Sequence, residues 1–388
     1  MMSLNKEFAE KFDDLNVIMG PRAMNKGTDV ERLERHARTL KEKGVSVLFD
    51  PQFYVPDSKL KKIKKYPYFN YKEYNPKDFN NNYAEDFLKS TIDYQLDKLD
   101  VNKLILPNIF INSITDDWYR MQEIFFNVIL NDNINLEIYH TLALGPDIIK
   151  NKDVFDEMIS KCINYPINGY YFVLKPPENS YLINDEEYIY SILDAFISLR
   201  NSDKDILLGF ANQQSLIYAS VGVNKIASGN YYNFRKFDPG TFMKDDRDTD
   251  PRRSDWYYDG NTLSEYKPQR LTLAYRRGLE KYFGPPSEYS KEFLESDRPS
   301  NYNWTTYNEF RHYLVTLRKQ WLKFKLTPSK ERIDKIIDFL EEKRSIMLEL
   351  KDKNFKPGNK AFDEEIIDSN LSALEAIKYD RKYDILNL

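Results

Sequence analysis

The sequence predicts an α/β fold, a TIM-type (β/α)8 barrel followed by a C-terminal helical extension. Short apolar runs alternate along the chain with segments of helical periodicity. Most positions in these runs are apolar and do not alternate with polar residues, which is typical of strands buried on both faces of a parallel sheet. Ile206–Asn230 contains a strand, a short helix and a second strand within 25 residues. A doubly wound open sheet is the alternative, and the lack of a glycine-rich dinucleotide fingerprint counts against it.

Seven short apolar runs are expected to form the strands. Small or polar residues, glycine or proline follow them, as expected where a buried strand leaves a sheet. The runs are Val17–Met19, Val45–Phe49, Lys103–Leu106, Leu136–Tyr139, Gly169–Leu174, Ile206–Leu208 and Val223–Ala227. Their alternation with helices makes an eightfold barrel the best fit.

The segments between these runs have apolar residues at helical spacing. In the first segment, apolar residues from Val30 to Leu40 recur at spacings of three and four, and Asp29 can cap the helix. The other predicted helices are Tyr83–Leu99, Trp118–Leu130, Val154–Ile163, Glu187–Leu199 and Ser215–Val221. Gly222 is expected to end the last of them at the C′ position.

One connection is longer than the others. The polar and aromatic segment from Pro51 to Asn82 exceeds the usual length of a loop between a strand and a helix. A lid or an insertion is therefore expected there.

Two domains are predicted, a barrel over residues 1–285 and a helical C-terminal region over residues 286–388. The pattern of the chain changes from about Pro239, and Gly284-Pro285-Pro286 is a candidate linker. Pro268–Phe283 is expected to hold the last barrel helix. Three further helices are predicted, Thr306–Phe324, Ser329–Leu350 and Phe362–Lys378, packed as a bundle or against the barrel.

Composition limits the possible classes of protein. A net charge of −4 over 388 residues does not favour a uniform electrostatic contact with nucleic acid, although it allows a local basic patch. No apolar run approaches the roughly 18 residues of a membrane helix, and no signal-peptide core is present, so a cytoplasmic location is predicted. The single cysteine, Cys162, excludes an internal disulfide. No metal site and no cofactor are predicted, because no ligand spacing is recognisable.

Polar side chains that follow the predicted strands define the expected site, because a parallel barrel carries its active site at the carboxyl ends of its strands. Asp50 and His140 are the candidate catalytic residues, since each can act as a general acid or base. Both also have structural interpretations, a turn cap for Asp50 and a buried polar residue for His140. The candidate substrate-binding residues are Asn108, Lys175, Asn212, Ser228, Asn230 and Arg235.

Partners are predicted from two features. Arg235-Lys236, together with Arg247, Arg252 and Arg253, could hold phosphate groups of tRNA or DNA or could form an ordinary charged loop. The C-terminal helices could bind a protein partner.

The order of these motifs resembles the tRNA-guanine transglycosylase superfamily, including its DNA-modifying relatives, over roughly residues 15–325. Val47–Phe53 corresponds to a strand followed by D-S-G-G-F-Q, and Leu136–Gly145 to a strand ending in Q-G-G. Gly209–Arg235 is similar to the late signature of the family, and Thr306–Trp321 to the helix that follows its zinc site. The resemblance implies a barrel that exchanges a guanine for a deazaguanine base.

The chain departs from this family at the residues that carry the reaction. Ala227 stands at the position of the nucleophilic aspartate, Asn108 at that of the base-reading aspartate, and Gly240–Asn261 holds no zinc-binding cysteine. Of the three family carboxylates only Asp50 is retained. Because alanine cannot attack a sugar carbon, the inherited covalent step is not expected.

Two functional hypotheses follow. The chain is either a divergent transglycosylase-like enzyme that acts on a nucleic-acid base or nucleoside, with Asp50 as acid–base and Arg235 near a phosphate, or a non-catalytic nucleotide-binding or scaffold subunit. A third class, an unrelated aldolase or hydrolase barrel, would use Lys175 as an imine-forming amine.

Overall fold

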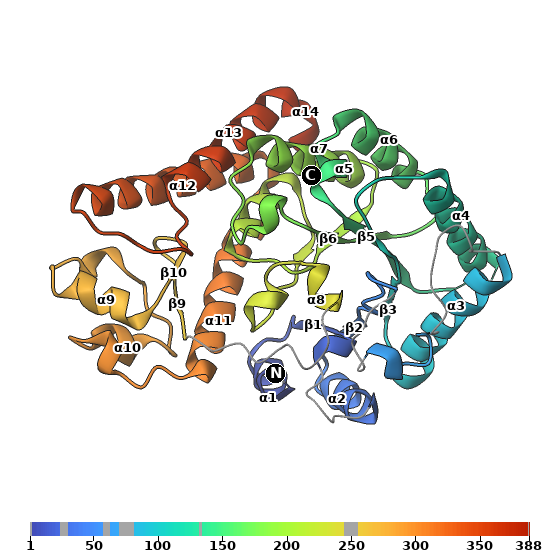
Figure 1. Ribbon diagram of the computed structural model, residues 1–388, viewed down its shortest axis with the longest axis horizontal. Coiled ribbons are helices and arrows are strands. Elements are labelled where there is room, and N and C mark those ends of the chain that lie inside the picture. The colour runs from blue at the N-terminus through green and yellow to red at the C-terminus, as the bar shows by residue number, and fades with distance from the viewer. Residues whose placement is uncertain are drawn as a thin grey trace. The chain divides into compact units, whose positions relative to one another are not determined.

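The computed structural model describes residues 2–23, 30–56, 63–69, 81–131, 134–243, 255–386 and 388. Contacts divide the chain into two compact units, and Figure 1 labels the helices and strands that belong to them. Unit 1 consists of Met1–Lys175, Ser202–Gly209 and Phe237–Asp250, and unit 2 consists of Pro176–Asn201, Phe210–Lys236 and Pro251–Leu388. Residue 285 is not a boundary of either unit, and the predicted division into folding domains stays a prediction.

Unit 1 contains the parallel sheet that the sequence predicts. The strands β3 (Lys103–Leu106), β5 (Glu137–Leu144), β6 (Gly169–Leu174) and β7 (Asp205–Leu208) lie side by side in this order, and all pair in parallel. The short strand β4 (Phe110–Ile111) pairs with the end of β5. A separate parallel pair is formed by β1 (Asn16–Met19) and β2 (Ser46–Phe49). The parallel α/β class is confirmed, but within the described residues the sheet does not close, and the predicted barrel is not shown.

Four helices of unit 1 lie close to their predicted positions. They are α2 (Val30–Glu42), α3 (Asn81–Asp93) with its π-helical continuation η4 (Tyr94–Lys98), α4 (Asp116–Asn131) and α6 (Lys152–Ile163). Three further helices were not predicted, α1 (Met2–Lys11), α5 (Pro146–Ile149) and α8 (Gly240–Met243). α2 buries Leu33, Ala37 and Leu40, the face that the spacing predicts. Its proposed cap, Asp29, lies outside the described residues, as does most of the predicted long connection before α3.

The contact between β6 and β7 leaves no room for a side chain at Gly169. A Cβ atom at this position would lie 2.3 Å from the backbone oxygen of Asp205 on the paired strand. We expect Gly169→Ala to lower the free energy of unfolding by about 1–3 kcal/mol, because a backbone neighbour cannot move aside as a side chain can. Gly240→Ala is the control, since its Cβ would meet only the flexible side chain of Asp238, at 3.0 Å. Equal denaturation midpoints for the two variants would contradict this register.

Unit 2 is mainly helical. It contains α7 (Glu186–Arg200), the 3-10 helix η6 (Gln213–Val221), β8 (Lys225–Ile226), α9 (Pro268–Tyr275), η9 (Glu280–Tyr282), α10 (Lys291–Glu295), α11 (Thr306–Lys325), α12 (Ser329–Asp352), α13 (Glu364–Asp380) and α14 (Lys382–Ile385). The three predicted C-terminal helices are confirmed as α11, α12 and α13. α12 packs on α13 and also contacts α11, and the three helices pack as well on other parts of unit 2, α13 on α7 and both α11 and α12 on η6.

In unit 2, the end of η6 was predicted from the sequence, whereas a short antiparallel strand pair was not. Gly222 ends η6 with a left-handed φ of 75°, as predicted. The antiparallel pair β9 (Tyr257–Asp259) and β10 (Ser264–Tyr266) was not predicted, and α9 ends earlier than the expected Phe283. Among the described residues, no helix is both long enough and apolar enough to cross a membrane.

Candidate functional site

Asp50 is a buried carboxyl group at the end of β2 in unit 1. The residue is 3% exposed. The Oδ1 atom accepts a hydrogen bond of 2.9 Å from the backbone N–H of Gln52, and the Oδ2 atom accepts one of 2.8 Å from the Tyr54 hydroxyl. Tyr171, on β6, donates a third bond of 3.4 Å to Oδ2. The Gln52 side chain also donates to this carboxyl group, so Asp50 is held by two donors of Gln52 and by two rotatable hydroxyl groups.

The surroundings of Asp50 set its proton affinity. Burial raises the pKa of Asp50 from 3.8 to about 6, against the opposing effect of its hydrogen bonds. The Arg22 guanidinium interacts electrostatically with Asp50 and donates a hydrogen bond of 3.0 Å to Thr241 Oγ1. Burial lowers the pKa of Arg22 to about 10, so this side chain remains a cation at neutral pH. A carboxyl group with a pKa near 6 can both take up and release a proton at neutral pH.

Asp259, in unit 2, shows why the pKa alone does not identify a site. Burial raises the pKa of Asp259 to about 6 as well. Its carboxylate accepts hydrogen bonds from the backbone N–H groups of Asn261, Thr262 and Gly284 and from the Thr262 hydroxyl. Three of these four donors are N–H groups that cannot reverse direction. Asp259 is therefore suited to hold a turn, whereas the hydroxyl partners of Asp50 can accept as well as donate.

Asn108 and His140 lie together, but away from Asp50. The Asn108 amide nitrogen lies 3.1 Å from His140 Nε2 and 3.0 Å from the side-chain oxygen of Gln122 on α4. His140 pairs with Tyr170 in the sheet register, one residue before Tyr171, so the two side chains point to opposite faces. Burial lowers the pKa of His140 to about 3, which keeps the ring neutral. His140 packs between the sheet and α4 and does not share a site with Asp50.

Lys175 directly follows β6 and is half-buried. Its backbone N–H donates to the carbonyl of Leu144 at 2.9 Å, which extends the strand pairing by one residue. The imine hypothesis requires a desolvated lysine, and this position does not provide full burial.

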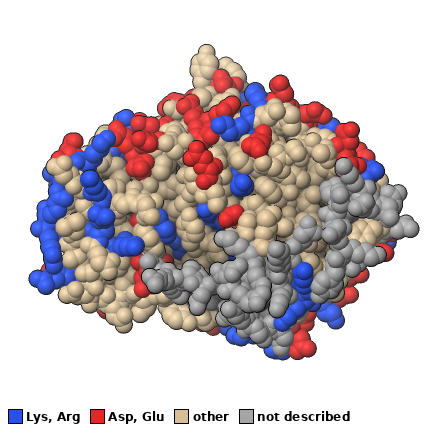
Figure 2. Space-filling model, viewed as in Figure 1, with Lys and Arg blue, Asp and Glu red and all other residues tan. Residues whose placement is uncertain are grey.

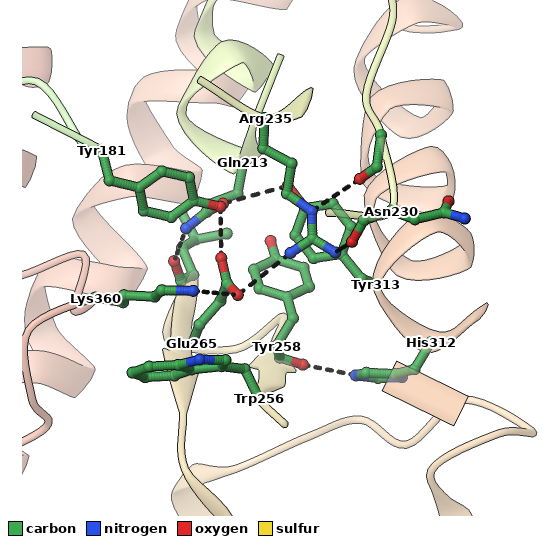
Figure 3. Close-up of polar contacts among 12 residues, drawn as sticks. Tyr181, Gln213, Asn230, Arg235, Trp256, Tyr258, Glu265, His312, Tyr313 and Lys360 are labelled. Carbon is green, nitrogen blue, oxygen red and sulfur yellow. Dashed lines mark hydrogen bonds and ion pairs between the residues drawn. The ribbon is translucent and has the colours of Figure 1, made fainter. Parts of the chain in front are cut away.

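Arg235 is the centre of a buried ionic cluster in unit 2, drawn in Figure 3. Its Nη1 atom lies 3.2 Å from Glu265 Oε2, and Lys360 Nζ lies 3.3 Å from the same oxygen. The Tyr181 hydroxyl donates to the other oxygen of Glu265. The Arg235 guanidinium also lies over the ring of Tyr313, 3.3 Å from its centroid. Since the side chains of Arg235 and Glu265 are 2% and 1% exposed, the cluster is shielded from solvent.

Two cations share one carboxylate in this cluster. Burial would raise the pKa of Glu265, but Arg235 and Lys360 outweigh it and hold the pKa below its ordinary value. Burial lowers the pKa of Lys360 despite the attraction of Glu265. Burial raises the pKa of Glu309, which interacts electrostatically with Arg235, to about 7. The ionic cluster therefore carries an excess of positive charge.

Among the remaining predicted residues of unit 2, Asn212 and Arg235 serve its internal structure. Asn212 caps η6, accepting from Gln214 N at 2.9 Å and donating to the carbonyl of Tyr181 at 2.8 Å. Arg235 donates to the carbonyls of Gly229 and Asn230, each at 2.9 Å, and so fixes the turn that follows β8. Asn230 is 4% exposed, and Ser228 is half-buried.

Of the residues predicted to hold phosphate groups, the structure describes Arg235 and Lys236. Arg235 is buried and paired, so it does not present a free guanidinium to a phosphate. Arg247, Arg252 and Arg253 lie outside the described residues. Lys236 donates to the carbonyl of Asn179 at 2.6 Å.

A different basic surface of unit 2 is formed by the turn after α9 and the end of α12. Figure 2 shows Lys and Arg side chains gathered at the left of the view, where Figure 1 places these elements. Arg277 donates to the backbone carbonyls of Lys353 and Asn354 and so connects the two segments. The exposed cations of this basic surface are Arg276, Arg277, Lys281, Lys351, Lys353 and Lys356.

Among the cluster residues that were missed from the sequence are Tyr54, Tyr171, Glu265 and Lys360. Tyr171 stands inside an apolar run, and Tyr54 falls in the predicted loop, so neither is distinguishable from core aromatics. Lys360 stands between two predicted helices. Glu265 carries a signal that could have been used, because a charged residue between Leu263 and Tyr266 in a short buried strand requires a buried partner.

The described residues contain no group of three or more His, Cys, Asp and Glu side chains that could hold a metal ion. No family model and no curated protein matches the sequence.

Proposed function

We propose that the chain is a divergent transglycosylase-like enzyme that acts on a nucleic-acid base or nucleoside, with Asp50 as its general acid–base. The proposed architecture is a (β/α)8-type barrel. Parallel strands in unit 1, with β2 next to β3, and the order of motifs along the chain support this architecture. The function and the family relationship depend on the Asp50 site.

The observation that carries the proposal is the hydrogen bonding of Asp50. When the bond between a base and its sugar breaks, the bonding electron pair goes to the base nitrogen, which then needs a proton. Protonated Asp50 can supply this proton, and water or an incoming base takes the vacant place at the sugar carbon. Tyr54 and Tyr171 can reorient their hydroxyls as the carboxyl group changes its charge. Arg22 favours the ionised form that remains after the transfer.

The test is to incubate the purified full chain with cellular tRNA and with DNA fragments and to measure released or exchanged bases by mass spectrometry. Asp50→Asn is expected to reduce base release or exchange by about 100-fold or more, the usual contribution of a general acid–base. Asp86→Asn, at an exposed position of α3, is the control and should leave the rate unchanged. Equal rates for Asp50→Asn and the wild type would exclude this role.

A non-catalytic recognition protein is the second candidate. The observation that favours it is that Asn212 and Arg235 both make hydrogen bonds within unit 2. Neither of these two strand-end side chains is therefore available for a reaction. Under this alternative, the same incubation would recover bound nucleic acid with no altered base.

A further inference from the structure

Lys360 lies among three aromatic rings of unit 2. Its ammonium nitrogen is 4.1 Å from the centroid of Trp256, 5.0 Å from that of Tyr232 and 5.4 Å from that of Tyr181. Figure 3 shows Trp256 alongside Lys360, with the Glu265 carboxylate at the tip of the Lys360 side chain. Tyr181 and Tyr232 pack together with ring centroids 4.8 Å apart. A cation is thus placed beside aromatic faces at the edge of the ionic cluster.

This arrangement leaves hydrogen-bonding capacity unused. Among the described residues, Lys360 makes one hydrogen bond, to Glu265, although an ammonium group has three N–H donors. Its side chain is 13% exposed. Glu309 accepts a bond from the backbone N–H of Trp256, and its Oε2 atom is buried without a partner. A buried acceptor without a partner is destabilising, and a ligand N–H that entered beside Trp256 would satisfy it.

The same place reaches the molecular surface. Tyr232 is 41% exposed, and Trp256 is half-buried. Lys267, exposed at the start of α9, places its ammonium 5.5 Å from the centroid of Trp256. A surface lysine over a ring can move aside at little cost, so that ring remains available for stacking.

We propose that Tyr232, Trp256, Lys267, Glu309 and Lys360, together the Trp256 site, bind one unpaired nucleotide of a single-stranded nucleic acid. The base stacks on Trp256 and Tyr232, and Glu309 accepts a base N–H. Lys267 and Lys360 contact the adjoining phosphate. That the ligand is nucleic acid rests on the proposed function, but the Trp256 site lies in unit 2 and makes no use of Asp50.

A single strand fits these groups better than a duplex. Aromatic side chains stack on bases that have left the helical stack, whereas the bases of a duplex present only their edges. Lysines beside stacking rings are the usual combination of groups in sites that follow a single strand. The Trp256 site offers both within one group of neighbouring residues.

The test measures fluorescence anisotropy of a labelled 12-nucleotide single strand of mixed sequence, as DNA and as RNA, with the duplex of the same sequence for comparison. Tyr232→Ala and Trp256→Ala are each expected to weaken single-strand binding by about 10-fold or more, as for loss of one stacking ring. Tyr232→Phe should bind like the wild type. Tyr379→Ala is the control, because Tyr379 is 85% exposed on α13.

The outcomes separate the two proposals. Wild-type binding that is equal for single strand and duplex, or absent for both, would overturn the Trp256 site. So would unchanged binding by Tyr232→Ala, a surface variant that should fold even if Trp256→Ala does not. Asp50→Asn is expected to bind the single strand normally. If it does and base chemistry is absent from the wild type, the proposed enzyme fails while the Trp256 site stands.

Discussion

Replacing Glu265 with alanine is expected to lower the free energy of unfolding by about 3–5 kcal/mol, the effect of removing one partner from a buried ion pair. Arg235 and Lys360 would both remain buried without their shared counter-charge. Desolvation of two unpaired cations is costly because the interior cannot replace their hydration. Urea denaturation of the purified chain gives the change directly.

Two variants provide controls. Lys360→Met should lower the free energy of unfolding much less than Glu265→Ala does, because it leaves Arg235 and Glu265 as an ion pair of one positive and one negative charge. Asp334→Ala removes an exposed ion pair with Lys378 and should change the free energy of unfolding by no more than about 1 kcal/mol. A Glu265→Ala variant as stable as Asp334→Ala would show that the buried charges are not paired as described.

Asp50→Asn is expected to reduce the pH dependence of stability. The native state keeps a proton on Asp50 up to about pH 6, whereas the unfolded chain releases it near its ordinary pKa of 3.8. The native state therefore binds more protons in this interval, so the contribution of Asp50 to stability falls as pH rises from about 4 to about 6 and is constant above. The difference between pKa values of 3.8 and about 6 corresponds to about 3 kcal/mol. Between about pH 4 and pH 7, the free energy of unfolding of Asp50→Asn should therefore rise by this amount relative to that of the wild type.

Asp259→Asn is the matched comparison, because burial raises the pKa of Asp259 to about 6 as well. The free energy of unfolding of Asp259→Asn, relative to that of the wild type, should rise with pH by the same amount. At every pH, however, Asp259→Asn should be less stable than Asp50→Asn. An asparagine amide would place N–H donors against fixed donors such as the backbone N–H of Gly284, at a cost of about 1–3 kcal/mol. Urea denaturation at several pH values distinguishes the two. Identical curves would contradict the proposed contrast between the two hydroxyl partners of Asp50 and the mainly fixed N–H donors of Asp259.

Local pattern predicted the elements of this chain well. The helices α2, α4, α6, α7, α11, α12 and α13 and the strands of the parallel sheet lie close to where apolar periodicity places them. Several elements were not predicted, among them α1 (Met2–Lys11), β9 and β10. β9 and β10 have three residues each, all buried, and so carry neither alternation nor length as a signal. The length of Pro268–Phe283 was overestimated because a helix followed by the 3-10 turn η9 has the same composition as one longer helix.

The candidate site was predicted in part. Asp50 and Asn108 stand at strand ends, as expected, and Asp50 has the raised pKa that an acid–base role requires. His140 lies on the other face of the sheet, and the direction of a side chain in a strand depends on a register that the sequence does not give. The family relationship, the substrate and the cytoplasmic location remain predictions.

The sequence by itself determined the parallel α/β class, the C-terminal helices and the absence of a disulfide. These properties follow from composition and from spacing along one chain, which are local quantities. Only the tertiary structure decided that Arg235 is buried against Glu265, that Lys360 joins them across 95 residues, and that Tyr171 reaches Asp50 across 121 residues. Such pairings arise from packing between distant segments, and the burial and charge that set a pKa come into being only when these segments meet.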